Sequence, residues 1–248
     1  MTKNNIKKTS KNPANKNIIK TVKKSIKIKH KPIKTSNNKK SSKTIKLAKK
    51  IIIVHGWSGD VNKGWFPWLK KILEGQGFNV VMEKMPEADK PKMELWVEQL
   101  KNISGKVDEQ TYFIGHSIGC QTIIRMLEKH QSERVGGAIF LAGWFNLKEY
   151  TYKENPDSEI ESRRVAAPWI NTTIDFTKVQ SKFYPGTITA IFSDNDPYVD
   201  LNNAEAFKQK LNARIVIDNN KGHFSEEDIN SIPILLEEVL RITKNIKD

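Results

Sequence analysis

The sequence predicts a compact doubly wound α/β domain, in which helices cover both faces of a mostly parallel sheet of about six strands. Two observations lead to this prediction. From Lys49 onward, short runs of β-branched residues alternate with amphipathic segments, and such alternation of strand and helix produces a parallel sheet. Before Lys49 the composition differs, because Lys, Asn, Ser, Thr and Ile dominate and no aromatic residue occurs.

The positive charge of the chain is concentrated at its N-terminus. Residues 1–50 contain 18 Lys and no Arg, Asp or Glu. Subtracting these 18 from the 42 basic residues of the chain leaves 24, against 28 acidic residues. Residues 51–248 therefore carry a net charge of −4 within a chain of +14, and their charge gives no reason to expect a nucleic-acid surface there.

Residues 1–48 are predicted to be a disordered tail, and residues 49–248 a single domain. A segment with so few apolar residues cannot offset the conformational entropy that folding costs. The simplest interpretation of the tail is a solvated linker. Two alternatives are a weak, salt-sensitive contact with a polyanion such as RNA, DNA or an anionic membrane, and a transit peptide, which the absence of Arg disfavours.

The elements of the domain follow from residue periodicity. The predicted strands are short runs rich in Ile, Val, Phe and Thr, and in chain order they cover residues 49–54, 78–82, 111–114, 138–142, 187–192 and 214–217. The predicted helices have apolar residues every three or four positions, and they cover residues 66–75, 93–103, 118–130 and 204–211. A closing helix is expected from an N-cap at Ser225, with Asp228 three residues on, to about Ile242. Residues 146–184 are polar and turn-rich, and they take the place of a large lid.

The segment Gly115-His116-Ser117-Ile118-Gly119 matches the G-x-S-x-G pattern, between a predicted strand and a predicted helix. In that setting a sharp turn holds the serine in a strained conformation, and the two glycines leave room for neighbouring backbone. The hydroxyl then projects beyond the sheet at the start of a helix, whose dipole favours a developing oxyanion. Ser117 is therefore the candidate nucleophile.

A serine nucleophile needs a base that a third group orients. His223 lies between the last predicted strand and the closing helix, at the same sheet edge as the serine, and is the candidate base. The loop after residues 187–192 offers two carboxylates. Asp196 is favoured as the acid because Pro197 stiffens its position. Asp194 remains the alternative acid, or it caps its own loop, and Asp200 is a weaker third choice.

Two backbone N–H groups are expected to form an oxyanion hole. One belongs to Ile118, directly after the nucleophile, and the other is assigned to Trp57 in the loop after the first strand. Gly56 lets that backbone approach closely. His55 is expected to brace the loop, and His116 to point away from the serine hydroxyl.

These motifs resemble the retinoblastoma-binding-protein-9 (YdeN-like) serine hydrolases of the α/β-hydrolase superfamily. The resemblance covers roughly residues 50–240, and it rests on five segments: His55-Gly56-Trp57, Gly64-Trp65-Phe66-Pro67-Trp68-Leu69, the serine motif, Asp194-Asn195-Asp196-Pro197 and Gly222-His223-Phe224. It implies a small α/β-hydrolase with little or no lid, and it places Ser117, Asp196 and His223 in the triad positions. It also implies esterase or peptidase-like activity on small substrates.

The leading hypothesis is a serine hydrolase that cleaves a small carboxylic ester, thioester or amide through an acyl-serine intermediate. No cofactor or metal is expected, because the sequence has no metal-binding constellation and no Gly-rich phosphate loop. The alternatives are a protein-interaction module that keeps the fold with marginal turnover, and polyanion binding through the tail. Six aromatic residues are candidates for a pocket wall, at least half of them expected in the core: Trp57, Trp65, Trp68, Trp144, Phe145 and Trp169.

A cytoplasmic location is expected. The chain has one cysteine, Cys120, so no internal disulfide can form. No apolar stretch reaches the about 18–20 residues that span a bilayer. The expected partner is a small acyl substrate.

Overall fold

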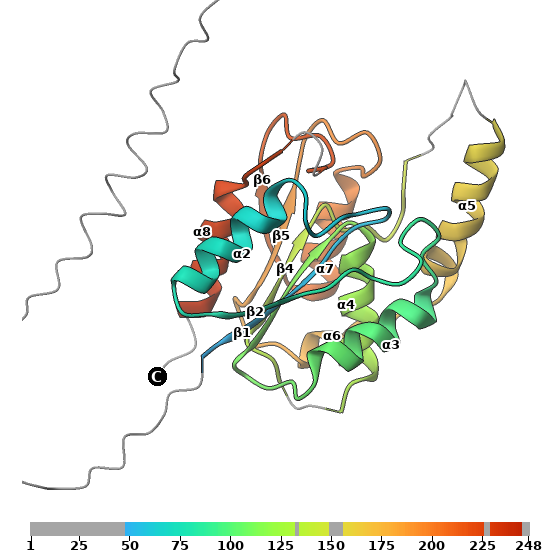
Figure 1. Ribbon diagram of the computed structural model, residues 1–248. Coiled ribbons are helices and arrows are strands. Elements are labelled where there is room, and N and C mark those ends of the chain that lie inside the picture. The colour runs from blue at the N-terminus through green and yellow to red at the C-terminus, as the bar shows by residue number, and fades with distance from the viewer. Residues whose placement is uncertain (1–47, 132–133, 149–155, 226–228, 245–248) are drawn as a thin grey trace, which may run out of the picture. The chain divides into compact units, whose positions relative to one another are not determined.

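The strands pair into one six-stranded, all-parallel sheet in the order β2-β1-β3-β4-β5-β6 (Figure 1). This is seen in a computed structural model, which describes residues 48–131, 134–148, 156–225 and 229–244. All of these residues belong to one compact unit. The predicted tail, residues 1–48, lies outside the described residues except for its last position.

The elements alternate as the sequence predicts. The strands are β1 (Lys50–Val54), β2 (Asn79–Met82), β3 (Thr111–His116), β4 (Gly137–Leu141), β5 (Ile188–Phe192) and β6 (Arg214–Ile217). The helices of the described residues are α2 (Trp65–Gly75), α3 (Met93–Ser104), α4 (Ile118–Lys129), α5 (Pro156–Asn171), α6 (Phe176–Ser181), α7 (Asn202–Leu211) and α8 (Pro233–Lys244).

Helices cover both faces of the sheet, and β1 shows why. Its alternate side chains enter different cores: Ile52 and Val54 join the cluster under α3, α4, α6 and α7, while Ile51 and Ile53 join the cluster under α2 and α8. All four side chains are almost fully buried, and each such burial stabilises the fold by about 1.5–3 kcal/mol. The predicted doubly wound α/β fold is confirmed.

The strand order places a switch point between β1 and β3. From β1 the chain crosses to β2 at one edge, and it then returns to β3 on the other side of β1. The loops that leave the carboxyl ends of β1 and β3 therefore diverge, and the space between them is where doubly wound sheets bind ligands. These two loops hold Trp57 and Ser117.

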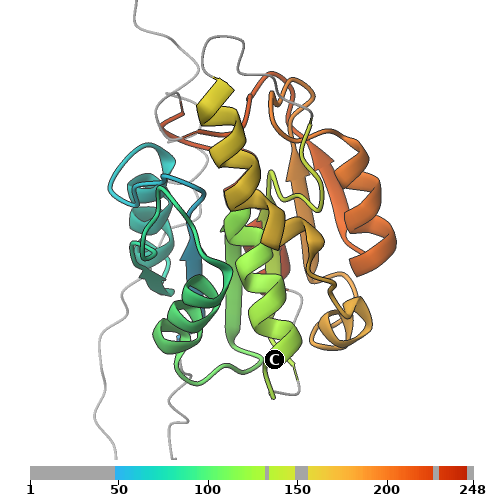
Figure 2. The same ribbon diagram turned by 90° about the vertical axis from the view of Figure 1, so that its right-hand side faces the viewer.

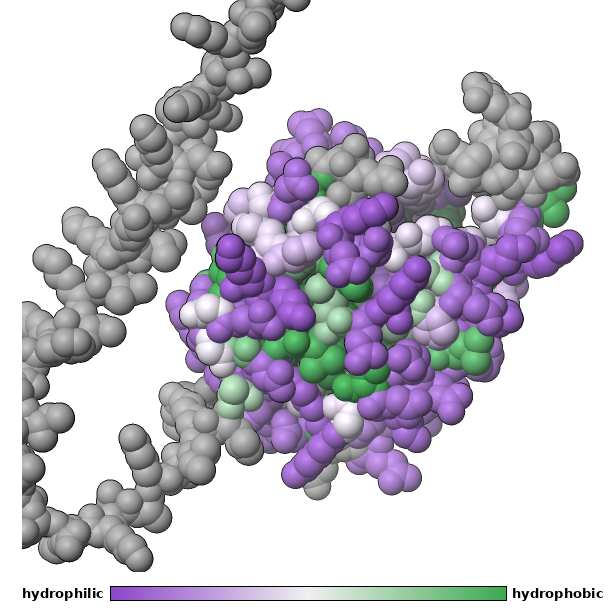
Figure 3. Space-filling model, in the orientation of Figure 1, coloured by the Kyte–Doolittle hydropathy of each residue, from purple (hydrophilic) through white to green (hydrophobic). Residues whose placement is uncertain are grey.

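The face of the domain seen in Figure 3 is largely hydrophilic. An apolar area on this face lies between α2 and α3, where Figure 1 shows the edge strand β2. Val81 and Met82 of β2 are half-buried and pack against the two cores. Within the described residues, no helix combines the length and the apolar character that crossing a bilayer requires.

The predicted start of the closing helix is wrong. Helix α8 begins at Pro233 instead of after Ser225. Proline suits the first position of a helix, because its φ is already helical and its missing N–H would have no partner there. Residue Asp228 of the predicted cap lies outside the described residues, and the Ser225 carbonyl accepts from the amide of Ile229 at 3.3 Å.

The prediction of a turn-rich segment over residues 146–184 misses two helices. Helix α5 has 16 residues and α6 has six. Helix α5 contains Pro168, a residue that normally ends helices, and this removed the sequence signal for a long helix. In Figure 2, α5 lies over the N-terminal end of α4.

Two glycines let α4 pack closely against the sheet. A Cβ on Gly115 would lie 2.8 Å from the backbone of Cys120, and a Cβ on Gly119 would lie 2.5 Å from the carbonyl oxygen of Val54. The expectation that the glycines of the serine motif make room for neighbouring backbone is therefore confirmed.

Gly119→Ala is expected to destabilise the domain. The added methyl group meets rigid backbone of β1, so the free energy of unfolding should fall by about 1–3 kcal/mol or more. Gly75→Ala is the matched control, because a Cβ at this last residue of α2 would have no atom within 4 Å. This substitution should raise the free energy of unfolding by about 0.5–1 kcal/mol. Urea unfolding of the three proteins checks this. Equal stability of the two variants would contradict the close approach of α4.

Candidate active site

Ser117 occupies a strained turn between β3 and α4. Its φ of 53° and ψ of −122° lie outside the region that a non-glycine residue prefers, at a cost of about 1–3 kcal/mol. Its amide donates to the carbonyl of Leu141 at 2.9 Å, and its carbonyl accepts from Cys120 at 3.0 Å. The turn places the side chain at the N-terminal end of α4, where the helix dipole favours negative charge.

Ser117, His223 and Asp196 lie in one hydrogen-bonded series. The Nε2 atom of His223 is 2.8 Å from Ser117 Oγ, and its Nδ1 atom is 2.7 Å from Asp196 Oδ2. An ionised carboxylate can only accept, so the network assigns the imidazole proton to Nδ1 and leaves Nε2 to accept the hydroxyl proton of the serine. The other oxygen of Asp196 accepts the amides of Tyr198 and Val199 at 2.8 and 3.0 Å.

The other carboxylate of this loop, Asp194, has a different contact. It is exposed, and its Oδ1 accepts the amide of Asn220 at 2.7 Å. The neighbouring side chains act alike: Ser193 Oγ accepts the amide of Lys221 at 2.9 Å, and Asn195 Oδ1 accepts that of Gly222 at 2.8 Å. Three consecutive side chains after β5 thus hold three consecutive amides of the loop after β6.

His55 lies in a bracing position within the loop after β1. Its Nε2 accepts the amide of Met85 at 2.8 Å, and its Nδ1 donates to the carbonyl of Gly56 at 2.6 Å. The ring is fully buried and packs edge-on against Trp96, with ring centroids 5.3 Å apart. Because both ring nitrogens are engaged, the imidazole fixes the backbone that carries Trp57.

His116 contacts the backbone of His223 instead of the serine hydroxyl. Its Nε2 donates to the carbonyl oxygen of His223 at 2.8 Å, while its buried Nδ1 has no hydrogen-bond partner among the described residues. Burial, together with the nearby His223, lowers the pKa of His116 to about 3. His116 is therefore neutral at physiological pH.

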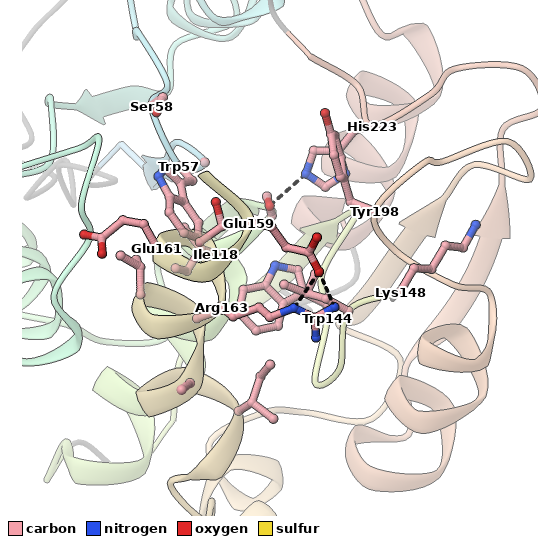
Figure 4. Close-up of a pocket in the computed structure, with 18 of the residues that line it drawn as sticks. Trp57, Ser58, Ile118, Trp144, Lys148, Glu159, Glu161, Arg163, Tyr198 and His223 are labelled. Atoms are coloured by element: carbon pink, nitrogen blue, oxygen red, sulfur yellow. Dashed lines mark hydrogen bonds and ion pairs between the residues drawn. The ribbon is translucent and has the colours of Figure 1, made fainter. Parts of the chain in front are cut away.

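A cleft of about 790 Å³ opens above the serine (Figure 4). Trp57 and Ile118, the two residues assigned to the oxyanion hole, line it together with Ser117 and His223. Helix α5 supplies one wall through Glu159, Glu161, Ser162, Arg163, Val165, Ala166, Ala167, Ile170 and Asn171. This wall was not expected from the sequence. Pro156, the first residue of α5, is a helix-start signal, but the interior proline masked it.

Of the six aromatic candidates for the pocket wall, Trp57 and Trp144 line the cleft. Trp65 and Trp169 are buried in the two cores. Figure 4 also shows Tyr198 beside His223, and their rings meet edge to face with centroids 5.2 Å apart.

Four of the charged side chains that line the cleft have partners within the protein. Glu159, whose side chain is 18% exposed, accepts two hydrogen bonds from Arg163 at 2.6 and 2.9 Å (Figure 4). Lys148 donates to the carbonyl of Asp196 at 2.7 Å, and Glu161 pairs with Lys90 outside the cleft at 3.0 Å.

Known proteins share this sequence pattern and fold. YdeN of Bacillus subtilis (strain 168) is 26% identical over 193 residues, which are 77% of this chain and 94% of that protein. The serine hydrolase RBBP9 of Rattus norvegicus is 24% identical over 200 residues, 80% of this chain and 95% of that protein. The crystal structure of the ydeN gene product from B. subtilis matches with a TM-score of 0.69 and 26% identity, over 80% of this chain and 100% of that one.

The resemblance that the motifs suggested is thereby confirmed, and so is the α/β-hydrolase fold. A family model described as "Serine hydrolase" matches residues 51–235. This match spans well over half of the chain and includes the strained serine, both loops that meet at His223, and the loop after β1. The chain therefore belongs to the serine hydrolase family.

Proposed function

We propose that this chain hydrolyses a small carboxylic ester, thioester or amide through an acyl intermediate on Ser117. The observation that supports this most strongly is the hydrogen-bonded series from Asp196 through His223 to the serine hydroxyl, at the floor of an open cleft. A buried acid, an oriented imidazole and a hydroxyl at a helix start are the parts that acyl transfer needs.

In the acylation step, Ser117 Oγ attacks the carbonyl carbon of the substrate while Nε2 of His223 takes the hydroxyl proton. Asp196 stabilises the imidazolium, and the amides of Trp57 and Ile118 stabilise the oxyanion. When the tetrahedral intermediate collapses, Nε2 gives its proton to the departing alcohol, thiol or amine. Water then attacks the acyl-serine, with His223 again as base, and releases the carboxylic acid and the free hydroxyl.

The size and lining of the cleft suit a substrate with a small and largely uncharged acyl group. Its volume of about 790 Å³ is within the range of small-molecule sites. Its apolar lining includes Trp144, Val165 and Ile170. Glu159 and Arg163 on the α5 wall pair with each other, so a charged acyl group against this wall would lose its hydration without gaining a free charge partner there.

A fluorophosphonate probe is expected to label Ser117, because it reacts with a serine hydroxyl that a neighbouring base activates. Ser117→Ala should abolish the labelling, as measured by mass spectrometry of the modified peptide. Ser162→Ala, which removes another hydroxyl that lines the cleft, is the matched control and should label like the wild type. A folded wild-type protein that stays unlabelled would speak against the proposal and for an interaction module.

The two carboxylates after β5 are expected to respond very differently to the same substitution. Asp196→Asn should slow labelling by about 10³–10⁴-fold, because an amide cannot hold the required tautomer of His223. Asp194→Asn keeps an oxygen that accepts the amide of Asn220, so the rate should stay within about threefold. The fluorophosphonate labelling rates of the two variants, each compared with the wild type, show which carboxylate is the acid. An equal loss of rate in both variants would undermine the assignment of Asp196.

A cytoplasmic location and a polyanion contact through residues 1–48 stay predictions. The second rests on the Lys-rich composition of this segment and is expected to weaken steeply with salt. Deleting residues 1–48 should remove any binding to a labelled DNA duplex, measured by fluorescence anisotropy, and should leave serine labelling unchanged. Binding that survives the deletion would show that the tail is not the contact.

A further inference from the structure

The loop that carries His223 has an unfavourable backbone. Asn220, Gly222 and Phe224 have φ values of 58°, 54° and 54°. Glycine and, to a lesser degree, asparagine tolerate the left-handed region, but it costs a residue such as Phe224 about 1–2 kcal/mol. The loop therefore needs contacts from the rest of the protein to keep this conformation.

Two buried side chains hold the carbonyl groups of this loop. His116 donates from Nε2 to the carbonyl of His223 at 2.8 Å. Trp65 donates from its indole nitrogen to the next carbonyl, that of Phe224, at 3.0 Å. The loop is thus held by its amides from the β5 side and by its carbonyls from the β3 and α2 side.

We propose that Trp65 and His116 are positioning residues, which hold the strained peptide after His223 and so keep its imidazole aligned between Asp196 and Ser117. This role rests on the proposed function, in which His223 is the base.

The two donors form one rigid unit. The Trp65 ring stacks on Phe66, with ring centroids 3.9 Å apart, and meets the His116 ring edge-on at 6.0 Å. Trp65 is fully buried at the first position of α2, and His116 is the last residue of β3. Because His116 directly precedes Ser117, the end of one strand fixes both the nucleophile and the backbone of its base.

The surroundings of His116 keep it a donor at Nε2. Its Nδ1 faces Gly56, where an added Cβ would lie only 2.9 Å away. Burial is the largest cause of its pKa of about 3; the charges of His223 and His55 also lower this pKa, and that of Asp196 raises it. The neutral ring therefore keeps its Nε2 proton throughout the pH range in which an ordinary histidine titrates.

Three variants test the proposal in the full chain. Trp65→Phe removes the indole donor and keeps an aromatic ring, and His116→Leu removes the other donor. His116→Gln restores an amide N–H near the position of Nε2. Trp169→Phe is the control, because it removes a buried indole bond of the same kind, to the carbonyl of Pro91 at 3.2 Å, without contact to the loop.

The readouts are the maximal rate of fluorophosphonate labelling and the probe concentration at half-maximal rate. Trp65→Phe and His116→Leu should lower the maximal rate by about 10–100-fold through misplacement of the base. The half-maximal concentration should change by less than about threefold. His116→Gln should recover most of the rate, and Trp169→Phe should keep the wild-type rate.

A second readout does not depend on reactivity. In the wild type, the proton between His223 Nδ1 and Asp196 is protected from exchange with water, and its strong hydrogen bond should give a downfield proton NMR signal. The signal is assigned through its absence in His223→Ala. Trp65→Phe should broaden this signal by exchange with water, and Trp169→Phe should not.

Wild-type rates and an unchanged signal in Trp65→Phe and His116→Leu would overturn the proposal, as would equal losses in Trp169→Phe. If His116→Leu does not fold, Trp65→Phe gives the decision through both readouts. An unreactive wild type would count against the proposed function alone, because the NMR signal still tests the positioning of His223.

Discussion

The strained turn at Ser117 is the constraint on which the rest of the site depends. A non-glycine residue keeps a φ of 53° here because β3 ends and α4 begins on either side of it. Gly115 and Gly119 allow α4 to lie directly against the ends of β3 and β1. This packing determines where the hydroxyl projects, which amides converge near it and where the cleft can open. Strain of this kind persists only where surrounding contacts over-determine the backbone.

The partner of the serine is held with similar rigidity, although it comes from a distant part of the chain. Parallel strands bring the loops after β3, β5 and β6 to one edge of the sheet. Side chains at 193–195 hold the amides of the loop after β6, and Trp65 and His116 hold its carbonyls. The imidazole of His223 is thus positioned chiefly through backbone contacts, which leaves the cleft free for a substrate.

Much of this arrangement could be predicted from the sequence, because periodicity and local turn chemistry are written in neighbouring residues. The strands of the sheet and the setting of Ser117 follow from such signals. The start of α8 could not be predicted in this way, because the local cap signal at Ser225 is weaker than the preference of Pro233 for a first helical position. Helix α5 was hidden by Pro168. The contacts of Asp194, Trp65 and His116 join segments far apart in the chain, so no local pattern distinguishes their roles.

A crystal structure of the protein after reaction with a small phosphonate ester tests the central claim most directly. The account predicts phosphorus on Ser117 Oγ, and one phosphonyl oxygen about 2.7–3.1 Å from the amides of Trp57 and Ile118. The apolar substituent should lie in the cleft against α5. An adduct on another residue, or a phosphonyl oxygen that faces solvent away from these two amides, would contradict it.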